Sequence, residues 1–420
     1  MSIIKKIPFG EFGKVLIRFA SAQIISNCLR MISGFLVIKF ITPELYGEFT
    51  GVGVYMGYIL LGHGGIINGL SRELPYELGR ENNQYAKEMA CSVYALSSIL
   101  SVLAAFIFLV LGLHNFISGD ALTGSIYMAY VLIGGLNLIN KQFLPVLYRT
   151  NNDFNSLAKQ NIFIGIGNLL SVLLVYFFNI YGLIVRGIFL TLLEFFLLFK
   201  NKPYQLSFTW NLGHFKKLFK TGFPIFIVGQ VTPLWSTVMN NIIFSIGGAL
   251  NFGLYSLSTI IQSAVGVIPM AFSKVIYPRM AIMLGEGKPV SQILKANLKP
   301  LYFQFGLMLV TALVGCFLLP LVIPFILPKY VDGIVAAQWM LFVPVVQSFG
   351  SLNNIYNVIK RQKWYFLSLV TGAVIGSFFI LWKIKTTDFH LEIFPQGLLL
   401  GTAIQQFLSL LFLSKLRKYA

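Results

Sequence analysis

The chain has 420 residues, of which 56% are hydrophobic and 11% are charged, and its formal net charge is +18. Water-soluble globular domains carry about a quarter charged residues, so this composition excludes an ordinary soluble globule. It predicts an all-α protein that crosses a membrane many times. The positive charge does not require a nucleic-acid partner, because cations beside membrane spans orient them and contact anionic lipid headgroups.

About twelve apolar stretches are long enough to cross a bilayer, since a spanning helix needs ~20 mostly apolar residues. In chain order they lie at 14–41, 46–70, 88–113, 121–147, 158–178, 180–199, 220–247, 250–277, 297–318, 332–359, 364–384 and 395–415. An even number of spans places both chain ends on one side. Lysine and arginine gather at both ends and after every second stretch. Because cation-rich loops stay in the cytoplasm, both termini are predicted to be cytoplasmic.

The first stretch is too long for a cleavable signal peptide and is expected to remain as an anchor. The three cysteines, Cys28, Cys91 and Cys316, are scattered inside predicted spans, with no Cys-x-x-Cys spacing. This arrangement favours neither disulfides nor a metal site.

The sequence repeats itself. ELYGEF around Gly47 and NFGLYS around Gly253 align 206 residues apart, and a Leu-Gly pair follows each glycine after thirty-two residues. VLYR at 146–149 and VIKR at 358–361 match 212 residues apart. Two copies with an even number of spans enter the membrane in the same direction. This predicts two parallel six-helix lobes, 1–199 and 220–420, related by a pseudo-two-fold axis with a substrate site between them, and a basic cytoplasmic linker at 200–219.

PELYGEF at 43–49, RELP at 72–75, FGLYS at 252–256, YPRM at 277–280 and NVIKRQKWYF at 357–366 resemble one family. This is the Wzx-type flippase branch of the multidrug/oligosaccharidyl-lipid/polysaccharide (MOP) exporter superfamily. The resemblance implies MATE-like lobes and alternating-access transport of an undecaprenyl-pyrophosphate-linked oligosaccharide to the outer leaflet of the bacterial plasma (inner) membrane. About twelve helices, rather than fourteen, imply an O-antigen, capsule or exopolysaccharide unit. Association with a polysaccharide polymerase complex is a further implication.

Arg30 lies nine residues before Lys39, ~14 Å from one end of the first span and so near mid-membrane. An arginine at this depth costs about 2.5–3.5 kcal/mol on insertion scales. Three explanations remain open: snorkelling to outer headgroups, pairing with Glu194, or contact with substrate. Gln23, Asn27 and Arg30 share one helical face, which favours a cavity over lipid. A guanidinium binds two pyrophosphate oxygens at once.

Other polar side chains inside predicted spans have two interpretations each. The cations contact substrate or bond helices and headgroups, and the amides bind sugar or neighbouring helices. The candidate substrate-binding residues are Gln23, Asn27, Arg30, Asn68, Lys141, Arg186, Asn240 and Lys274. Pro233 and Pro269 are expected to kink or break their helices, and Gly64 and Gly65 to loosen theirs, so these four residues are the candidate hinges.

No ATP-type phosphate loop occurs in the sequence, and no cofactor is expected. Coupling to H⁺ or Na⁺ requires an intramembrane ionisable group, for which Glu194 and His63 are the candidates. A multidrug exporter of the same superfamily is one alternative, although cationic drugs favour acids and the spans hold several cations against about one acid. A membrane enzyme acting on the same lipid carrier is the other, but the predicted outer loops are short. We therefore predict a transporter and not an enzyme.

Overall fold

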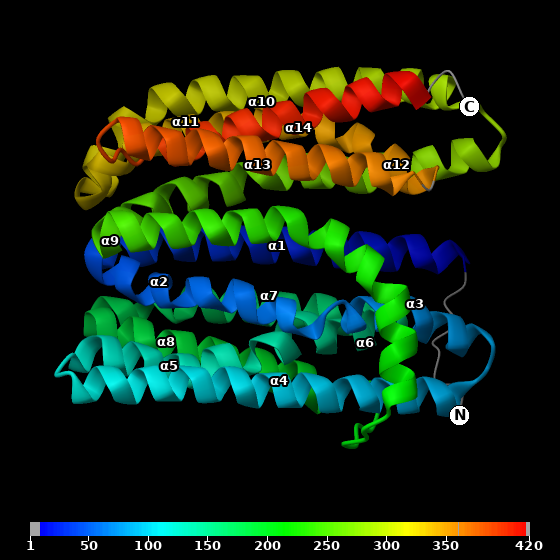
Figure 1. Cartoon of the computed structure of the whole chain (residues 1–420), viewed down its shortest axis with the longest axis horizontal. Helices are drawn as coiled ribbons and strands as arrows, with labels where there is room; N and C mark the ends of the chain where they lie inside the picture. Colours follow the sequence, from blue (N-terminus) through cyan, green and yellow to red (C-terminus); the bar gives the residue numbers. More distant parts are fainter. Residues whose placement is uncertain (1–8, 360, 417–420) are drawn as a thin grey trace. The chain divides into compact units, whose positions relative to one another are not determined.

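The computed structural model describes residues 9–359 and 361–416 (Figure 1), and all regular structure in these ranges is helical. The first helices are α1 (Phe9–Phe40), α2 (Pro43–Ile59), η1 (Leu60–His63), α3 (Ile66–Gly79), α4 (Asn83–Ile117), α5 (Ala121–Leu138), the π-helix η2 (Ile139–Phe143), α6 (Leu144–Thr150), α7 (Phe154–Leu170) and α8 (Val172–Lys200). After α9 (Leu212–Gly285) follow α10 (Val290–Ile326), η3 (Pro328–Gly333), α11 (Ile334–Gln347), η4 (Ser348–Asn353), α12 (Asn354–Val358), α13 (Gln362–Thr386) and α14 (Ile393–Leu416).

The helices confirm the prediction of about twelve membrane crossings. Among the described residues, nine helices are long and apolar enough to cross a membrane, or ten if the bent pair Pro43–His63 and Ile66–Gly79 is one span. Two of the nine contain a non-helical residue, Asn179 in α8 (φ 51°, ψ −124°) and Gly248 in α9 (φ 73°, ψ 178°). Dividing α8 at Asn179 leaves residues 172–178 as a continuation of α7, in the place of the fifth predicted span. Dividing α9 at Gly248 separates the seventh predicted span from the eighth. The described chain is then divided into twelve helical stretches that lie near the predicted spans.

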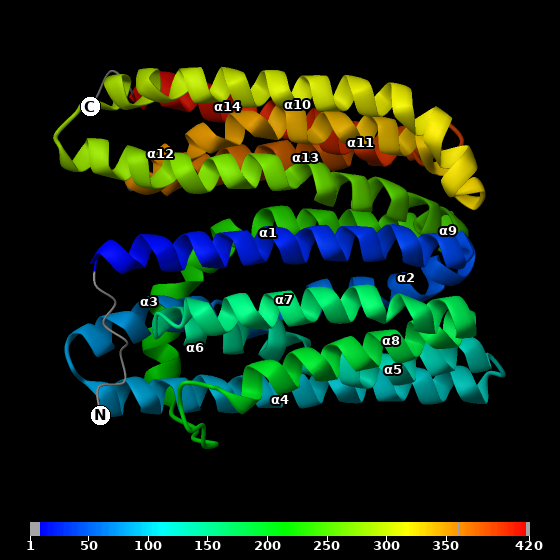
Figure 2. The ribbon, with the colours of Figure 1, turned by 180° about the vertical axis from the view of Figure 1, so that it is seen from behind.

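The turn at Asn179 depends on a close backbone approach. Beyond it the chain reverses, so that residues after 180 run back beside 172–178, and α7 and α8 lie antiparallel in Figure 2. A Cβ atom on Gly182 would overlap the carbonyl of Leu174. Only glycine therefore allows this hairpin to close.

The chain forms two compact units. We call Met1–Ile41 with Glu48–Thr237 the N-lobe, and Thr42–Gly47 with Val238–Ala420 the C-lobe. The boundary thus lies inside α9, later than the predicted linker at 200–219. The reason is that residues 212–237 pack against α3, where a Cβ on Gly69 would overlap the backbone of Leu218 and one on Gly222 would overlap that of Gly65. Small residues let helix backbones meet in this way.

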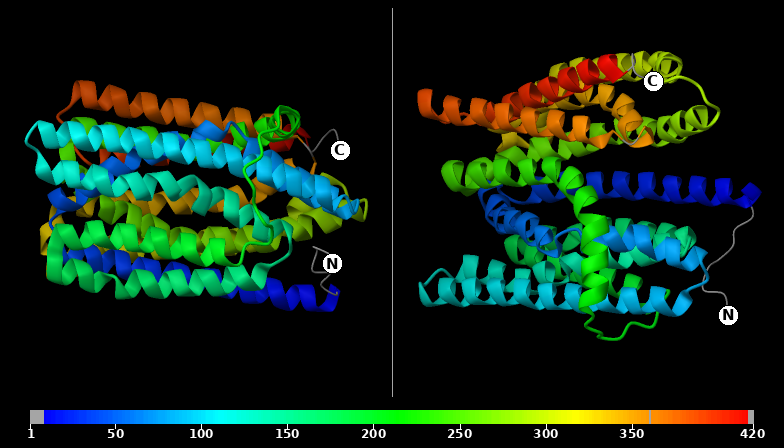
Figure 3. Two further views of the ribbon diagram at one scale, coloured as in Figure 1. Left: turned by 90° about the horizontal axis from the view of Figure 1, so that it is seen from below. Right: turned by 45° about the vertical axis from the view of Figure 1, so that its right-hand side comes forward.

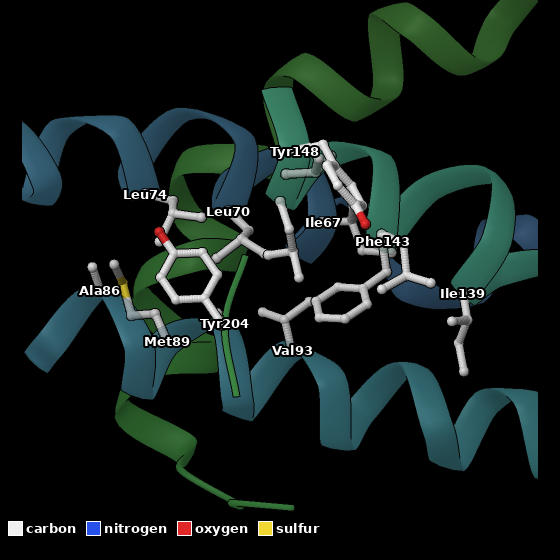
Figure 4. Packing of buried hydrophobic residues seen from close by; sticks show 14 of the residues in the cluster. Ile67, Leu70, Leu74, Ala86, Met89, Val93, Ile139, Phe143, Tyr148 and Tyr204 are labelled. Carbon is white, nitrogen blue, oxygen red and sulfur yellow. The ribbon is translucent and has the colours of Figure 1, made fainter. Parts of the chain in front are cut away.

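The core of the N-lobe includes residues from the predicted linker. Figure 3 shows the start of α9, in green, running across the N-lobe helices beside α4, where the rings of His214 and Tyr85 are 5.1 Å apart. Tyr204 and Leu218 belong to a buried cluster built mainly from α3, α4 and the η2–α6 segment. Figure 4 shows ten labelled members of this cluster: Ile67, Leu70, Leu74, Ala86, Met89, Val93, Ile139, Phe143, Tyr148 and Tyr204. The segment after residue 200 is therefore anchored by packing.

The repeat of 206 residues has a direct counterpart in the C-lobe. A Cβ on Gly47 would overlap the carbonyl of Ala249, and a Cβ on Gly253 would overlap that of Pro43. Ala249 and Gly253 lie 206 residues after Pro43 and Gly47. The two contacts are therefore exchanged copies of each other within the C-lobe.

The second sequence match is displaced by one helical turn. Tyr148 donates to the carbonyl of Leu198 at 2.7 Å, and Tyr356 donates to that of Ser409 at 2.6 Å. Tyr356 follows Tyr148 by 208 residues, and the starts of α13 and α7 differ by the same number. The structural repeat here is 208 rather than the 212 inferred from VLYR and VIKR. A four-residue shift keeps the same helical face, so a helical sequence pattern does not distinguish the two offsets.

Candidate functional site

Two adjoining polar cavities lie inside the N-lobe, with volumes of about 190 and 180 Å³. Their walls come mainly from α1, the α5–η2–α6 segment, α7 and α8, and both include Lys141, Ile164 and Glu194. We refer to the pair as the N-lobe cavity. Each part is smaller than the ~300–1,000 Å³ typical of pockets for drug-sized ligands, so it suits a compact polar group.

Three cations and one acid line this cavity. Arg30 lines one part, Arg149 lines the other, and Lys141 and Glu194 line both. Lys141 Nζ lies 2.5 Å from Glu194 Oε2, with side-chain exposures of 48% and 12%. Arg30 Nε is buried without a hydrogen-bond partner in the described part of the chain. The cavity therefore carries more positive than negative charge, and Glu194 pairs with Lys141 rather than with Arg30.

The π-helical turn η2 aims two polar residues at α8. Asn140 Nδ2 donates to the carbonyl of Thr191 at 3.1 Å, and the next residue, Lys141, reaches Glu194 one turn farther along α8. A π-turn inserts an extra residue into a helix and re-aims the side chains that follow, which is why such turns often occur at functional sites. Here it directs Lys141 into the cavity.

Amide side chains extend the polar wall. Gln23 Nε2 donates to Asn27 Oδ1 at 3.1 Å, and Asn161 Nδ2 donates to Gln23 Oε1 at 3.0 Å. Gln23 and Asn161 line the same part of the cavity as Arg149. Predicted residues Gln23, Asn27, Arg30, Lys141 and Glu194 are thus brought together, and neutral hydrogen-bonding groups lie beside the cations.

Arg186 lies next to this cavity in a structural position. Its Nη2 donates to Ser33 Oγ at 3.0 Å and to Asn168 Oδ1 at 3.2 Å, and Ser33 Oγ donates to the carbonyl of Asn168 at 2.7 Å. Asn168 itself lines the cavity. Arg186 therefore connects α8 with α1 and α7, which fits the helix-bonding interpretation and places a fourth cation close to the other three.

The remaining candidates lie elsewhere. Asn68 is half-buried on α3 and is not among the lining residues, and Asn240 is half-buried on α9 in the C-lobe. Lys274 falls in α9, but its side chain lies outside the described residues. His63 is buried away from the cavity, where its Nδ1 accepts from the Gly65 N–H at 3.1 Å and its ring packs on Phe226.

At the four predicted hinge residues, the helix breaks occur at the glycines and not at the prolines. Gly64 and Gly65 have φ of 53° and 90°, and the chain bends by 51° between the helices on either side. In contrast, α9 stays helical through Pro233 and Pro269 and breaks at Gly248. The Thr237 hydroxyl, one turn after Pro233, donates to the Pro233 carbonyl at 2.9 Å, a bond of the kind that serine and threonine make inside helices.

Sequence reasoning missed Arg149 and Asn161. Arg149 was assigned to a loop because the fourth span was ended at 147, whereas α6 continues to Thr150. Lys141, Pro145 and Arg149 follow at four-residue intervals and all line the cavity. Asn161 and Asn168, seven residues apart on α7, likewise share a helical face and line the cavity. Both patterns were present in the sequence as helical periodicity. In the described residues, no group of three His, Cys, Asp or Glu side chains forms a metal site.

Comparison with known proteins gives a consistent result. A family model described as "Polysaccharide biosynthesis protein" matches residues 77–329. The chain is similar to an inward-facing multidrug resistance MATE family transporter of the MOP superfamily, at 15% identity and TM-score 0.76, covering 95% of this chain and 98% of that one. An outward-facing structure of such a transporter matches at 15% identity and TM-score 0.64, covering 99% of each chain.

A third solved structure, a MOP superfamily transporter from Pyrococcus furiosus Vc1 (DSM3638), matches at 16% identity and TM-score 0.60, covering 99% of each chain. No curated protein matches the sequence. At these identities the solved structures establish the fold, which is that of MOP superfamily transporters.

Proposed function

The chain belongs to the polysaccharide biosynthesis protein family, and we propose that it is a flippase for an undecaprenyl-pyrophosphate-linked oligosaccharide. Its multi-span fold is that of a membrane transporter. The proposed cargo is an O-antigen, capsule or exopolysaccharide repeat unit, moved from the cytoplasmic to the outer leaflet of the bacterial plasma membrane. Cytoplasmic termini and association with a polymerase complex are part of the same proposal.

The cation-lined N-lobe cavity is the observation that carries this proposal. Arg30, Lys141 and Arg149 surround a space of headgroup size with Glu194 as the single acid among its lining residues. A pyrophosphate presents several charged oxygens to such a set, and an arginine forms two charge-assisted hydrogen bonds with them. In a cavity within the membrane this attraction is less screened than in water. The sugar and the lipid chain are too large for the cavity and must lie outside it.

The same cavity argues against the multidrug alternative. Several of the solved relatives are multidrug transporters, but an organic cation is repelled by a site with three cations and one acid. The Pyrococcus furiosus relative is described with a binding pocket whose reverse polarity suggests a different function. Pocket polarity is the property on which we also separate this chain from drug exporters.

The direct test is transport by the purified chain in liposomes. Lipid-linked oligosaccharide is placed in both leaflets, and the fraction accessible to a membrane-impermeant sugar oxidant is followed with time. Wild-type protein is expected to make the inner-leaflet fraction accessible, and protein-free vesicles are the control. If the chain moves no lipid-linked sugar but transports small organic cations, the flippase assignment fails and the multidrug function replaces it.

Glu194 is the proposed coupling residue, with His63 as the second candidate for an H⁺ or Na⁺ response. Because Glu194 neutralises Lys141, a proton on Glu194 frees Lys141 for the substrate phosphate. Glu194→Gln is expected to bind substrate at least as well as wild type, while its flipping rate no longer responds to an imposed pH gradient. The matched control is Glu81→Gln, at an exposed turn. An undiminished response in Glu194→Gln would assign coupling elsewhere.

A further inference from the structure

The C-lobe contains a second, larger cavity of different character. It has a volume of about 870 Å³ and lies between α11, α13 and α14. Its walls are apolar, with Phe342, Phe379, Leu399 and Ala403 among them, and its two polar side chains are Lys383 and Gln396. We call it the C-lobe groove.

The surroundings of the groove determine what fills it. All three helices belong to candidate membrane spans, Pro328–Tyr356, Gln362–Thr386 and Ile393–Lys415. An apolar cavity does not hold ordered water, because a water molecule there lacks hydrogen-bond partners. Burial of a hydrocarbon chain in such a space is favourable in proportion to the apolar area covered. Among the molecules of a membrane, a lipid chain fits this lining best.

The polar residues mark one end of the groove. Lys383 is in the last turn of α13 and Gln396 is in the first turn of α14, so both lie at the end where α13 and α14 are joined (Figure 1). Lys383 forms no ion pair with a described residue, and its Nζ is 5.7 Å from the ring centroid of Trp382. A cation at the end of an apolar groove complements a lipid whose headgroup is a phosphate.

The internal repeat makes the contrast with the N-lobe informative. The groove is formed by the tenth, eleventh and twelfth spans, which correspond to the fourth, fifth and sixth spans of the N-lobe. In the 208-residue register, Val345 of the groove corresponds to Asn137 of the N-lobe cavity. Corresponding helices thus carry cations and amides in one lobe and aromatic and aliphatic side chains in the other. This difference fits two chemically different parts of an amphipathic ligand.

We propose that the C-lobe groove binds the isoprenoid chain of a polyprenyl phosphate, with Lys383 contacting its phosphate. The choice of a polyprenyl rather than a phospholipid chain rests on the proposed function. In the predicted topology, the connection between α13 and α14 faces the outer leaflet, where a flipped lipid would arrive.

Photochemical crosslinking tests this site without transport. The full-length protein carries benzoylphenylalanine at Leu399, inside the groove, or at Phe378, which is 70% exposed on the same lobe. It is placed in vesicles of phosphatidylethanolamine and phosphatidylglycerol with a trace of tritiated polyprenyl monophosphate. After illumination, label at position 399 is expected to exceed label at 378 several-fold. Excess unlabelled polyprenyl phosphate is expected to remove it, and excess phosphatidylglycerol is not.

Two substitutions distinguish the contact with the isoprenoid chain from the contact with the phosphate headgroup. Lys383→Gln is expected to lower crosslinking about tenfold, the size of one lost charge-assisted bond, and Lys385→Gln, two residues on and exposed, is expected to leave it unchanged. Ala403→Trp places a large side chain in the groove and is expected to lower labelling, with gel filtration as the check on folding. Equal competition by phosphatidylglycerol would show a bulk lipid chain in the groove, and an unaffected Lys383→Gln would remove the phosphate contact.

The outcome is distinguishable from that of the flippase proposal. If the protein is labelled specifically at position 399 but moves no lipid-linked sugar, the groove proposal stands and the flippase proposal fails. If the protein flips the lipid-linked sugar but is not labelled at position 399, the flippase proposal stands and the groove proposal fails.

Discussion

Arg30→Ala is expected to lower the rate of oligosaccharide flipping ten- to a hundredfold while the protein folds normally. The magnitude corresponds to the loss of about 1.5–3 kcal/mol of charge-assisted hydrogen bonding to the substrate phosphate. Folding is expected to be preserved because Arg30 Nε has no hydrogen-bond partner among the described residues, so its removal leaves no partner unsatisfied there. Arg30→Lys keeps the charge but cannot form two parallel hydrogen bonds to the phosphate. Its flipping rate is expected to lie between those of the wild type and Arg30→Ala.

Arg18→Ala is the matched control for this experiment, because Arg18 is an exposed arginine on the same helix. Its flipping rate is expected to equal that of the wild type. Lys141→Ala is a poorer probe, since it leaves the largely buried Glu194 carboxylate without its partner and therefore perturbs folding as well as binding. Wild-type flipping by a well-folded Arg30→Ala protein would show that the guanidinium has a packing or headgroup role and does not contact substrate.

Gly253→Ala is expected to destabilise the protein by at least about 3 kcal/mol, the upper range for overpacking, because the new methyl group overlaps backbone atoms of Pro43. A backbone carbonyl in a helix cannot rotate away as a flexible side chain does. Gly47→Ala is expected to have a similar effect, because Gly47 makes the exchanged contact with Ala249. Thermal unfolding of the purified variants in detergent measures both.

Gly266→Ala tests whether this loss is specific to the contact. Gly266 also lies on α9, and a Cβ there would meet no atom within 4 Å. In a helix, alanine in place of glycine is neutral or stabilising, by up to about 1 kcal/mol. The melting temperature of Gly266→Ala is therefore expected to stay near or above that of the wild type. If Gly253→Ala melts at the same temperature as Gly266→Ala, the two segments are not in backbone contact.

Several features followed from the sequence because they depend only on local patterns. Hydrophobic length defines each span, and the helices of the described chain, divided at the turns near residues 179 and 248, lie near the predicted spans. The 206-residue repeat appeared as matched glycines, which the structure shows in exchanged contacts. The family resemblance is confirmed by the family model and by the MOP transporter fold. The shared face of Gln23, Asn27 and Arg30 was equally visible as a helical period.

Only the tertiary structure shows which residues these side chains contact. A helical period tells which side chains share a face, but the rotation and depth of a neighbouring helix decide what that face meets. For this reason the sequence left open whether Glu194 pairs with Arg30, and the structure gives it to Lys141, fifty-three residues away along the chain. The π-turn that aims Lys141 is a one-residue change in winding with no distinct sequence signature.

The same limit explains the other differences. Pro233 and Pro269 were expected to kink or break their helices, but α9 stays helical at both and leaves helical geometry at Gly248, where φ is positive. Asn68 and Asn240 have the right chemistry but lie outside the N-lobe cavity. The C-lobe groove consists of ordinary apolar residues that in sequence are indistinguishable from lipid-facing ones. The sequence thus determined the spans, the repeat and the polar faces from local periodicity, whereas helix packing alone decided which side chains meet and where a cavity remains between them.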